Sequence, residues 1–314
     1  MGLLLRLAGA EMATDRIRVM TFEAADGSDL PEWSAGAHVD FDLGTLGTRS
    51  YSLIDWPKGR NTAHYVVAVQ REEPGEGGSA AMHKLAVGDT IPAEAPKNDF
   101  ELRDHPGPAL LLAGGIGVTP MISMATALQA AGREYRFIYA GRTASAMAFR
   151  EDIPAAFVEA VAFHMDDGDS LDLVALMQTL TPDTHLYICG PRGMIDAARE
   201  AAVAAGHAGD QIHIELFTSS AEAKGDSAFE VEMASTGDVY TIPPGKSIID
   251  VLEDAGHDLI YDCQRGDCGI CQTDVISGEP DHRDVVLSDA EKASGKLMQI
   301  CVSRAKSARL VLDL

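Results

Sequence analysis

Hydrophobic and polar residues alternate in short runs through the first part of the chain. The clearest runs lie at 17–21, 38–42 and 65–69, and turn-forming clusters separate them at 26–29, 44–47 and 74–78. A period of two is typical of strands with one buried face. Many short strands joined by turns predict an antiparallel β-barrel or sandwich.

From residue 108 onward, continuous apolar runs alternate with longer segments of helical periodicity. The apolar runs lie at 109–113, 137–140, 160–163 and 186–189, and the helical segments at 119–131 and 193–205. Buried strands separated by helices predict a doubly wound, largely parallel sheet. The uncharged segment 106–132 is long enough to span a bilayer, but its prolines and glycine cluster favour a buried strand, a turn and a helix.

A third pattern follows the small, polar segment 218–228, which is the best candidate for a linker. Apolar residues alternate with glutamates over 229–233, a polar turn follows, and a second strand is expected at 239–242. Ser247 is expected to cap a helix that ends near Gly256. The predicted organisation is a barrel domain at 1–103, an α/β domain at 104–217, the linker, and an α+β domain at 229–314.

Composition and charge exclude several classes of function. The 314 residues include 25 Lys and Arg against 48 Asp and Glu, a net charge of −23. Nucleic acids and anionic membranes attract clustered positive charge, so we expect neither as a partner. The apolar run at 3–5 ends at Arg6, so it is too short for the apolar core of a signal peptide. Five cysteines are too few for a disulfide scaffold. Both observations predict a cytoplasmic protein.

Four of the five cysteines lie in the last quarter of the chain. They are Cys263, Cys268, Cys271 and Cys301, and the first three are spaced C-x4-C-x2-C. This spacing is typical of the four thiolates around a plant-type [2Fe–2S] cluster. Gly266 and Gly269 let the loop turn without a Cβ. The alternatives are a structural zinc site, whose cysteines normally come in two close pairs, and buried thiols without a ligand.

Three further motifs suit nucleotide cofactors. Arg49-Ser50-Tyr51-Ser52, on an early strand, offers a cation, an aromatic ring and hydroxyls for a phosphate and a flat ring, although an exposed strand with a polar face would look the same. Gly114-Gly115-Ile116-Gly117-Val118-Thr119-Pro120 follows a buried strand and opens a helix, so it suits a pyrophosphate; a purely structural glycine turn is the alternative. Cys189-Gly190-Pro191-Arg192-Gly193-Met194 follows another apolar strand.

In this order the motifs resemble the phthalate dioxygenase reductase family, which includes the reductase components of Rieske-type oxygenases and O-demethylases such as vanillate demethylase. The resemblance spans nearly the whole chain, and its ferredoxin part continues through 278–284. It implies an FMN-binding antiparallel β-barrel domain, an NAD(P)H-binding α/β domain with a parallel sheet, and an α+β ferredoxin domain with a β-grasp fold. FMN is preferred to FAD because 52–98 offers no extra aromatic platform for an adenine and because the family uses FMN. NADH and NADPH both stay open.

The resemblance also assigns roles to residues. It implies that Arg49 contacts the flavin phosphate, Tyr51 lies against the flavin ring and Ser52 hydrogen-bonds near N5. The other implied flavin contacts are Ser50, Ala68, Val69, Gln70, Gly77, Gly78 and Ser79. The implied nicotinamide contacts are Gly114, Gly115, Gly117, Thr119, Pro120, Arg142, Gly190, Pro191 and Met194. One iron would be held by Cys263 and Cys268, and the other by Cys271 and Cys301.

Ser52, Cys189 and Phe217 are the implied catalytic residues. Cys189 would pack beside the nicotinamide, and Phe217 would cover the flavin, with a core phenylalanine as the alternative. Glu76 departs from the family, which usually carries an arginine there, and a carboxylate beside a phosphate is unfavourable. His282 is expected to be a satisfied or surface histidine, because four thiolates complete the iron ligands.

The implied function is electron transfer from NAD(P)H through FMN and the cluster to a terminal oxygenase. Residues 227–314 carry 16 acidic and 8 basic side chains, a net charge of −8, so we expect the monomeric protein to dock transiently on a basic oxygenase surface near the cysteine loop. The alternatives are a reductase for a cytochrome P450 or a diiron oxygenase, and a flavin-free iron–sulfur carrier.

Overall fold

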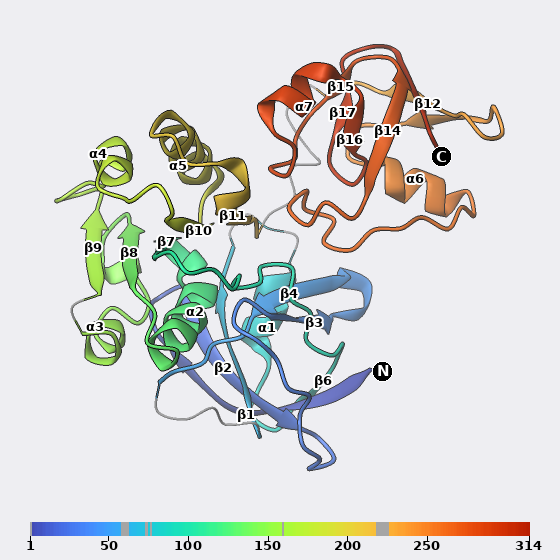
Figure 1. The fold of residues 1–314 in the computed structure, drawn as a ribbon. Coiled ribbons are helices and arrows are strands. Elements are labelled where there is room, and N and C mark those ends of the chain that lie inside the picture. The colour runs from blue at the N-terminus through green and yellow to red at the C-terminus, as the bar shows by residue number, and fades with distance from the viewer. Residues whose placement is uncertain (1, 58–62, 73–74, 76, 159, 218–225) are drawn as a thin grey trace. The chain divides into compact units, whose positions relative to one another are not determined.

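The computed structural model describes the chain except residues 1, 58–62, 73–74, 76, 159 and 218–225. It divides into two compact units, Met1–Glu215 and Leu216–Leu314, which are described separately (Figure 1). In the described residues, no helix has the length and apolar character needed to cross a membrane. Glu76 and most of the expected linker lie outside the described residues.

The first unit begins with a six-stranded antiparallel sheet. Its strands are β1 (Leu3–Met12), β2 (Ile17–Ala24), β3 (His38–Asp42), β4 (Thr48–Ser52), β5 (Tyr65–Gln70) and β6 (Thr90–Ala93), in the order β4-β3-β6-β1-β2-β5. The terminal strands β4 and β5 lie next to each other, so the sheet closes as the predicted barrel. Inward-facing residues fill it, with the Phe22 and Phe41 ring centroids 5.0 Å apart. A short helix, α1 (Gly78–Lys84), follows β5.

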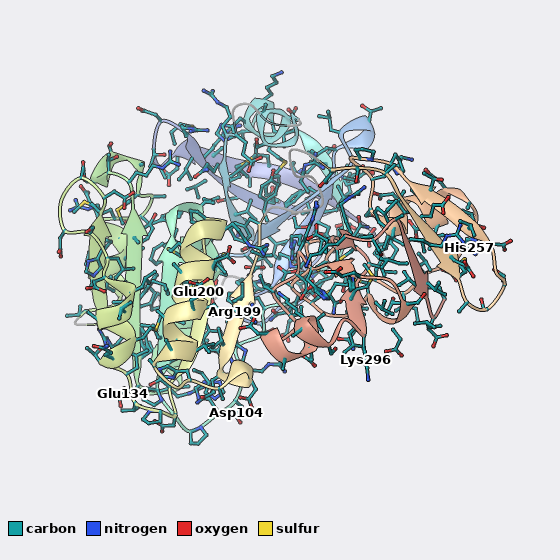
Figure 2. All side chains as sticks on the ribbon, turned by 90° about the horizontal axis from the view of Figure 1, so that it is seen from above. Asp104, Glu134, Arg199, Glu200, His257 and Lys296 are labelled. Atoms are coloured by element: carbon teal, nitrogen blue, oxygen red, sulfur yellow. The ribbon has the colours of Figure 1, made fainter. Side chains whose placement is uncertain are left out.

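The second half of this unit is a five-stranded parallel sheet with helices between its strands. The strands are β7 (Ala109–Gly114), β8 (Tyr135–Gly141), β9 (Val161–Met165), β10 (His185–Cys189) and β11 (Ile212–Glu215), in the order β11-β10-β7-β8-β9. The helices are α2 (Val118–Ala130), α3 (Asp152–Ala156), α4 (Leu173–Gln178) and α5 (Arg192–Ala204), and the 3₁₀ turn η2 (Gly115–Gly117) precedes α2. The segment 106–132 thus forms the predicted strand, turn and helix. On α5, polar residues such as Glu200 lie on the outside of the helix (Figure 2).

The barrel and the parallel sheet share one hydrophobic core. Ile17 and Ala68 of the barrel belong to the same buried cluster as Leu111 and Met121. Ser123 Oγ on α2 donates to Leu53 O at 2.7 Å and accepts from Asp55 N at 2.9 Å. The predicted boundary at 103–104 therefore falls inside a single compact unit, and its position stays a prediction.

The second unit has the mixed sheet and crossing helix expected of a β-grasp fold. Its five-stranded sheet contains β12 (Phe229–Met233), β13 (Val239–Ile242), β14 (Gln272–Ser277), β16 (Leu297–Gln299) and β18 (Arg309–Leu312), in the order β13-β12-β18-β14-β16. Only β12 and β18 pair in parallel among these described strands. Ser247 caps helix α6 (Ile248–Asp254), as predicted, and the structure adds that it forms a capping box with Asp250. The remaining elements are β15 (Pro280–Asp281), β17 (Arg304–Ala305) and α7 (Asp289–Ser294).

Candidate functional site

The serines on β4 have different surroundings. Ser50 Oγ donates to the Asp40 carboxylate on the neighbouring strand β3. Ser52 Oγ is buried, and no hydrogen-bond partner meets it among the described residues. Buried hydroxyls nearly always have a partner. The Ser52 hydroxyl therefore fits a ligand atom at the end of β4, as the implied flavin contact requires.

Arg49 meets the start of α1 from a distant part of the chain. A Cβ built on Gly78 would lie 2.6 Å from Arg49 Nε, so glycine at this position lets the Arg49 side chain lie against the start of α1. Gly77 has a φ of 92°, which also favours glycine, and Ser79 Oγ accepts a hydrogen bond from Glu72 N. A guanidinium beside the first amides of a helix fits a phosphate group. Burial raises the pKa of nearby Tyr51, which keeps its ring neutral.

The implied ring-lining residues Ala68, Val69 and Gln70 lie on β5. The Val69 carbonyl is held by His83 Nε2 at 2.8 Å, and Ala68 is buried. Strand β5 lies in contact with η2, the glycine turn after β7. The first unit therefore brings the implied flavin and nicotinamide motifs together.

The nicotinamide motifs meet at the carboxyl edge of the parallel sheet. The chain proceeds from β7 to one side of the sheet and later returns to its other side at β10, so the topological switch point lies between these strands. A Cβ on Gly117 would lie 2.2 Å from Cys189 O, and one on Gly190 would lie 2.9 Å from Gly114 Cα. Glycine thus lets the two turns pack directly. A Cβ on Gly114 would also lie 2.7 Å from Pro191 Cδ and from Met194 Sδ, so the start of α5 meets the end of β7, and Thr119 and Pro120 lie in the first turn of α2.

Cys189 has a neighbour that the sequence analysis did not single out. Its thiol is fully buried at the end of β10, 4.0 Å from an oxygen of Glu215. Glu215 ends β11, is 2% exposed and pairs with Cys189 in the strand register. The available signal was an acidic residue at the end of an apolar strand, which is the usual place of functional residues in such sheets.

Arg142 and Phe217 have different positions. Arg142 is exposed and follows β8 at the same carboxyl edge, where it can meet an adenosine group. Phe217 belongs to the second unit and is 37% exposed. Its cover of the flavin therefore stays a prediction.

The four clustered cysteines come together in the second unit. The neighbouring thiols of Cys268 and Cys301 lower the pKa of Cys263, and the Cys301 thiol lowers that of Cys271. Arg265 N also donates to Cys263 Sγ at 3.3 Å. The donor set, four thiols with a backbone amide directed at one sulfur, fits a [2Fe–2S] cluster.

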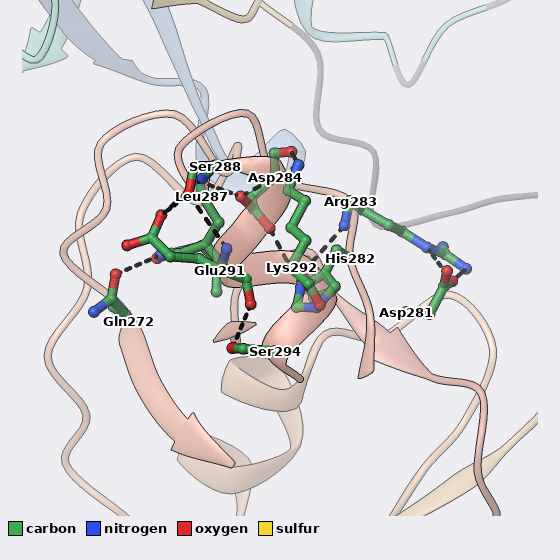
Figure 3. A network of polar contacts seen from close by, with 12 residues as sticks. Gln272, Asp281, His282, Arg283, Asp284, Leu287, Ser288, Glu291, Lys292 and Ser294 are labelled. Carbon is green, nitrogen blue, oxygen red and sulfur yellow. Dashed lines mark hydrogen bonds and ion pairs between the residues drawn. The ribbon is translucent and has the colours of Figure 1, made fainter. Parts of the chain in front are cut away.

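The arrangement differs from that of a zinc site. Tetrahedral zinc gathers four ligands around one ion. In this chain Cys271 follows Cys268 closely, but Cys263 lies five residues before Cys268 and Cys301 stands alone, whereas structural zinc sites usually join two close cysteine pairs. The spacing therefore fits a [2Fe–2S] cluster better than a zinc ion. His282 Nε2 lies 3.1 Å from Lys292 O, whereas its buried Nδ1 has no hydrogen-bond partner among the described residues and lies 3.9 Å from Asp284 Oδ1 (Figure 3). The expected satisfied histidine is therefore found for only one of the two ring nitrogens.

Comparison with known proteins identifies two domains and the family of the chain. Residues 111–200 match the family described as the oxidoreductase NAD-binding domain, and residues 231–306 match the 2Fe-2S iron-sulfur cluster binding domain. The chain is 38% identical to vanillate O-demethylase oxidoreductase from Pseudomonas sp. strain HR199, covering 98% of both chains. It is 37% identical to phthalate dioxygenase reductase from Burkholderia cepacia, covering 94% of this chain and 93% of that one. The chain belongs to the phthalate dioxygenase reductase family.

Solved structures extend the comparison. A structure titled as phthalate dioxygenase reductase, a modular structure for electron transfer from pyridine nucleotides to [2Fe-2S], superposes with a TM-score of 0.75 at 34% identity, covering 100% of this chain and 98% of that chain. An intact type IV self-sufficient cytochrome P450 monooxygenase superposes with a TM-score of 0.76 at 36% identity, and the match covers 100% of this chain and 41% of that longer one. The family and the fold predicted from the sequence are therefore confirmed.

Proposed function

We propose that this protein is the reductase component of a Rieske-type oxygenase or O-demethylase system. It takes electrons from NADH or NADPH and passes them through FMN and a [2Fe–2S] cluster to a separate oxygenase, in transient contact with it. The observation that carries the proposal is the full-length match to a reductase whose title describes electron transfer from pyridine nucleotides to [2Fe-2S], over a chain that supplies a fitting site for each group.

The residues of the chain have distinct tasks in this scheme. Bound FMN supplies the conversion between two-electron and one-electron transfer. Arg49 and the first amides of α1 would hold its phosphate, and the Ser52 hydroxyl would donate to the ring edge. The packed turns at Gly117 and Gly190 would place the nicotinamide at the end of β10. There the buried side chains of Cys189 and Glu215, 4.0 Å apart, would line the site and exclude water from it.

A second candidate partner is a cytochrome P450. It is favoured by the match to the self-sufficient monooxygenase, in which a chain of this type forms part of the same polypeptide as the P450. In that case the cysteine loop would face a haem protein instead of a Rieske protein.

The test is an absorption spectrum of the purified protein before and after anaerobic NADH, with the released flavin identified by chromatography. We expect flavin bands and a broad iron–sulfur shoulder, both bleached by NADH, and FMN as the released flavin. A shoulder without flavin would overturn the reductase function and leave an iron–sulfur carrier. Reduction of a purified Rieske oxygenase but not of a P450, or the reverse, decides the partner.

A further inference from the structure

Gln299 is a fully buried polar residue beside one of the cluster cysteines. It ends β16, two residues before Cys301, and is 0% exposed. Its Oε1 accepts a hydrogen bond from Cys271 Sγ at 3.5 Å. Cys271 is also buried and belongs to the hydrophobic core of the ferredoxin unit. Burial of an amide is costly unless its polar atoms are bonded, so the contact with this sulfur matters for Gln299.

Main-chain hydrogen bonds hold the backbone on both sides of this contact. Strands β14 and β16 pair in antiparallel register, with Gln272 opposite Gln299. Ile300 N donates to Cys271 O at 3.4 Å, and Ser303 N donates to Gln299 O at 3.0 Å. The sheet and the turn after it therefore place the Gln299 side chain beside the Cys271 sulfur.

The other atom of the Gln299 amide meets Gln272. Gln299 Nε2 donates to Gln272 Oε1 at 3.4 Å. Gln272, labelled in Figure 3, begins β14 and is exposed. An exposed amide can rotate to donate instead of accept, and water can replace it as a partner. The outer contact of Gln299 can therefore reverse its direction, whereas the inner contact faces a buried sulfur.

Binding of iron changes what the Cys271 sulfur can do. A cysteine that holds iron is a thiolate, which has lost its proton and can only accept hydrogen bonds. The Gln299 carbonyl oxygen would then face a negatively charged sulfur at 3.5 Å, and this contact is repulsive. Rotation of the amide by about 180° around its last side-chain bond removes the repulsion, because this torsion is broad and two-fold. It places Nε2 beside the sulfur and Oε1 towards Gln272.

We infer that Gln299 is a positioning residue of the iron–sulfur site, whose Nε2 donates a hydrogen bond to the Cys271 thiolate and makes the cluster easier to reduce. Reduction adds negative charge to the cluster and its sulfurs, so an N–H donor stabilises the reduced state more than the oxidised state. The inference rests on the iron–sulfur part of the proposed function and names a residue that sets the reduction potential.

The first test compares reduction potentials in the full-length holoprotein. Gln299→Met keeps an unbranched side chain of similar size but removes the donor. Gln272→Met removes the neighbouring, exposed amide and is the matched control. Titration with dithionite and redox mediators, followed by the cluster absorption, gives the potential. We expect Gln299→Met to lower the equilibrium constant for reduction about three- to tenfold, where tenfold is about 59 mV for one electron.

Gln272→Met should keep the parental potential. An unchanged potential in Gln299→Met, or equal shifts in the two variants, would overturn the inference.

A second measurement leaves Gln299 in place. Glutamine labelled with nitrogen-15 at its side-chain amide allows electron–nuclear double resonance on the reduced, paramagnetic cluster. We expect a nitrogen-15 coupling in the parent protein and the same coupling in Gln264→Met, which removes the exposed amide next to Cys263. Absence of the coupling in the parent protein, or its loss in Gln264→Met, would contradict a donor at Gln299.

Neither measurement uses NADH or an oxygenase. A protein that binds no cluster would overturn both the proposed function and this inference. A normal cluster whose potential does not depend on Gln299 would overturn this inference alone.

Discussion

Ser52 is the residue that we propose donates a hydrogen bond to the flavin ring. Its hydroxyl is buried and unsatisfied in the described part of the chain, whereas its strand neighbour Ser50 is bonded to Asp40. A donor directed at an atom whose charge changes during hydride transfer acts mainly on the rate.

We therefore expect Ser52→Ala to slow flavin reduction by NADH about 10- to 100-fold, the equivalent of one hydrogen bond, while FMN remains bound. Stopped-flow flavin absorption measures the rate, and flavin content measures binding. Ser28→Ala, in an exposed turn where the hydroxyl bonds to Asp26, serves as the control and should leave the rate unchanged. An unchanged rate in Ser52→Ala would contradict the flavin contact.

Three histidines stack on one another near the amino ends of β10 and β11. The rings of His105 and His185 are 3.6 Å apart, and His185 Nδ1 lies 3.0 Å from His213 Nε2. Burial, the neighbouring histidines and Arg133 or Arg103 lower the pKa of His105 and of His213 to about 4. Asp104 and Asp210 only partly oppose these effects, and Figure 2 labels Asp104. The folded unit therefore keeps these rings neutral.

This stack predicts a loss of stability in acid. Below the ordinary histidine pKa of 6.5, the unfolded chain binds protons that the folded stack does not, so the free energy of unfolding should fall as the pH decreases from about 6.5 towards 4. Thermal unfolding of the first unit across this range measures the slope. In the His213→Asn variant, the free energy of unfolding should change less with pH than in the parent protein. We also expect this variant to be less stable at pH 7. A slope as steep as that of His64→Asn, outside the stack, would contradict the prediction.

At the scale of elements, the contact between the turns after β7 and β10 shapes the nicotinamide site. Since a Cβ at position 117 would overlap the Cys189 carbonyl, Gly117→Ala must push the two turns apart. Such overpacking costs about 1–3 kcal/mol, so we expect NADH to bind roughly 5- to 150-fold more weakly. Titration of the protein with NADH measures the affinity. Gly168→Ala, where a Cβ meets nothing within 4 Å, should bind NADH normally; equal affinities in both variants would refute the packing role.

At the scale of the whole molecule, we expect charge to govern the encounter with the proposed oxygenase partner. Residues 227–314 carry a net charge of −8, which fits docking on a basic oxygenase surface. We expect the second-order rate of oxygenase reduction to fall by roughly tenfold as ionic strength rises from low to physiological values, because exposed charges are screened beyond about 8 Å. The rate of flavin reduction by NADH in the same buffers is the control. A salt-independent partner rate would eliminate electrostatic docking.

Local patterns specified much of the protein. The residues with a period of two at 17–21 and 65–69 form strands β2 and β5, and Ser247 caps helix α6. These features depend on residues close in sequence, so they can be predicted without the tertiary structure. Strand β1 was harder to predict, because charged residues interrupt its apolar positions. Its pairing with β2 and β6, which the local sequence does not show, stabilises it.

The cysteine spacing determined the cluster chemistry and, with the other motifs, the family. Only the tertiary structure decided which groups meet: Glu215 with Cys189, Leu216 with Asp267, and Asp226 with Arg283. These partners are 26 to 57 residues apart, and their contacts depend on strand register and loop packing. Register and packing are fixed by the whole core at once, so no local pattern encodes them.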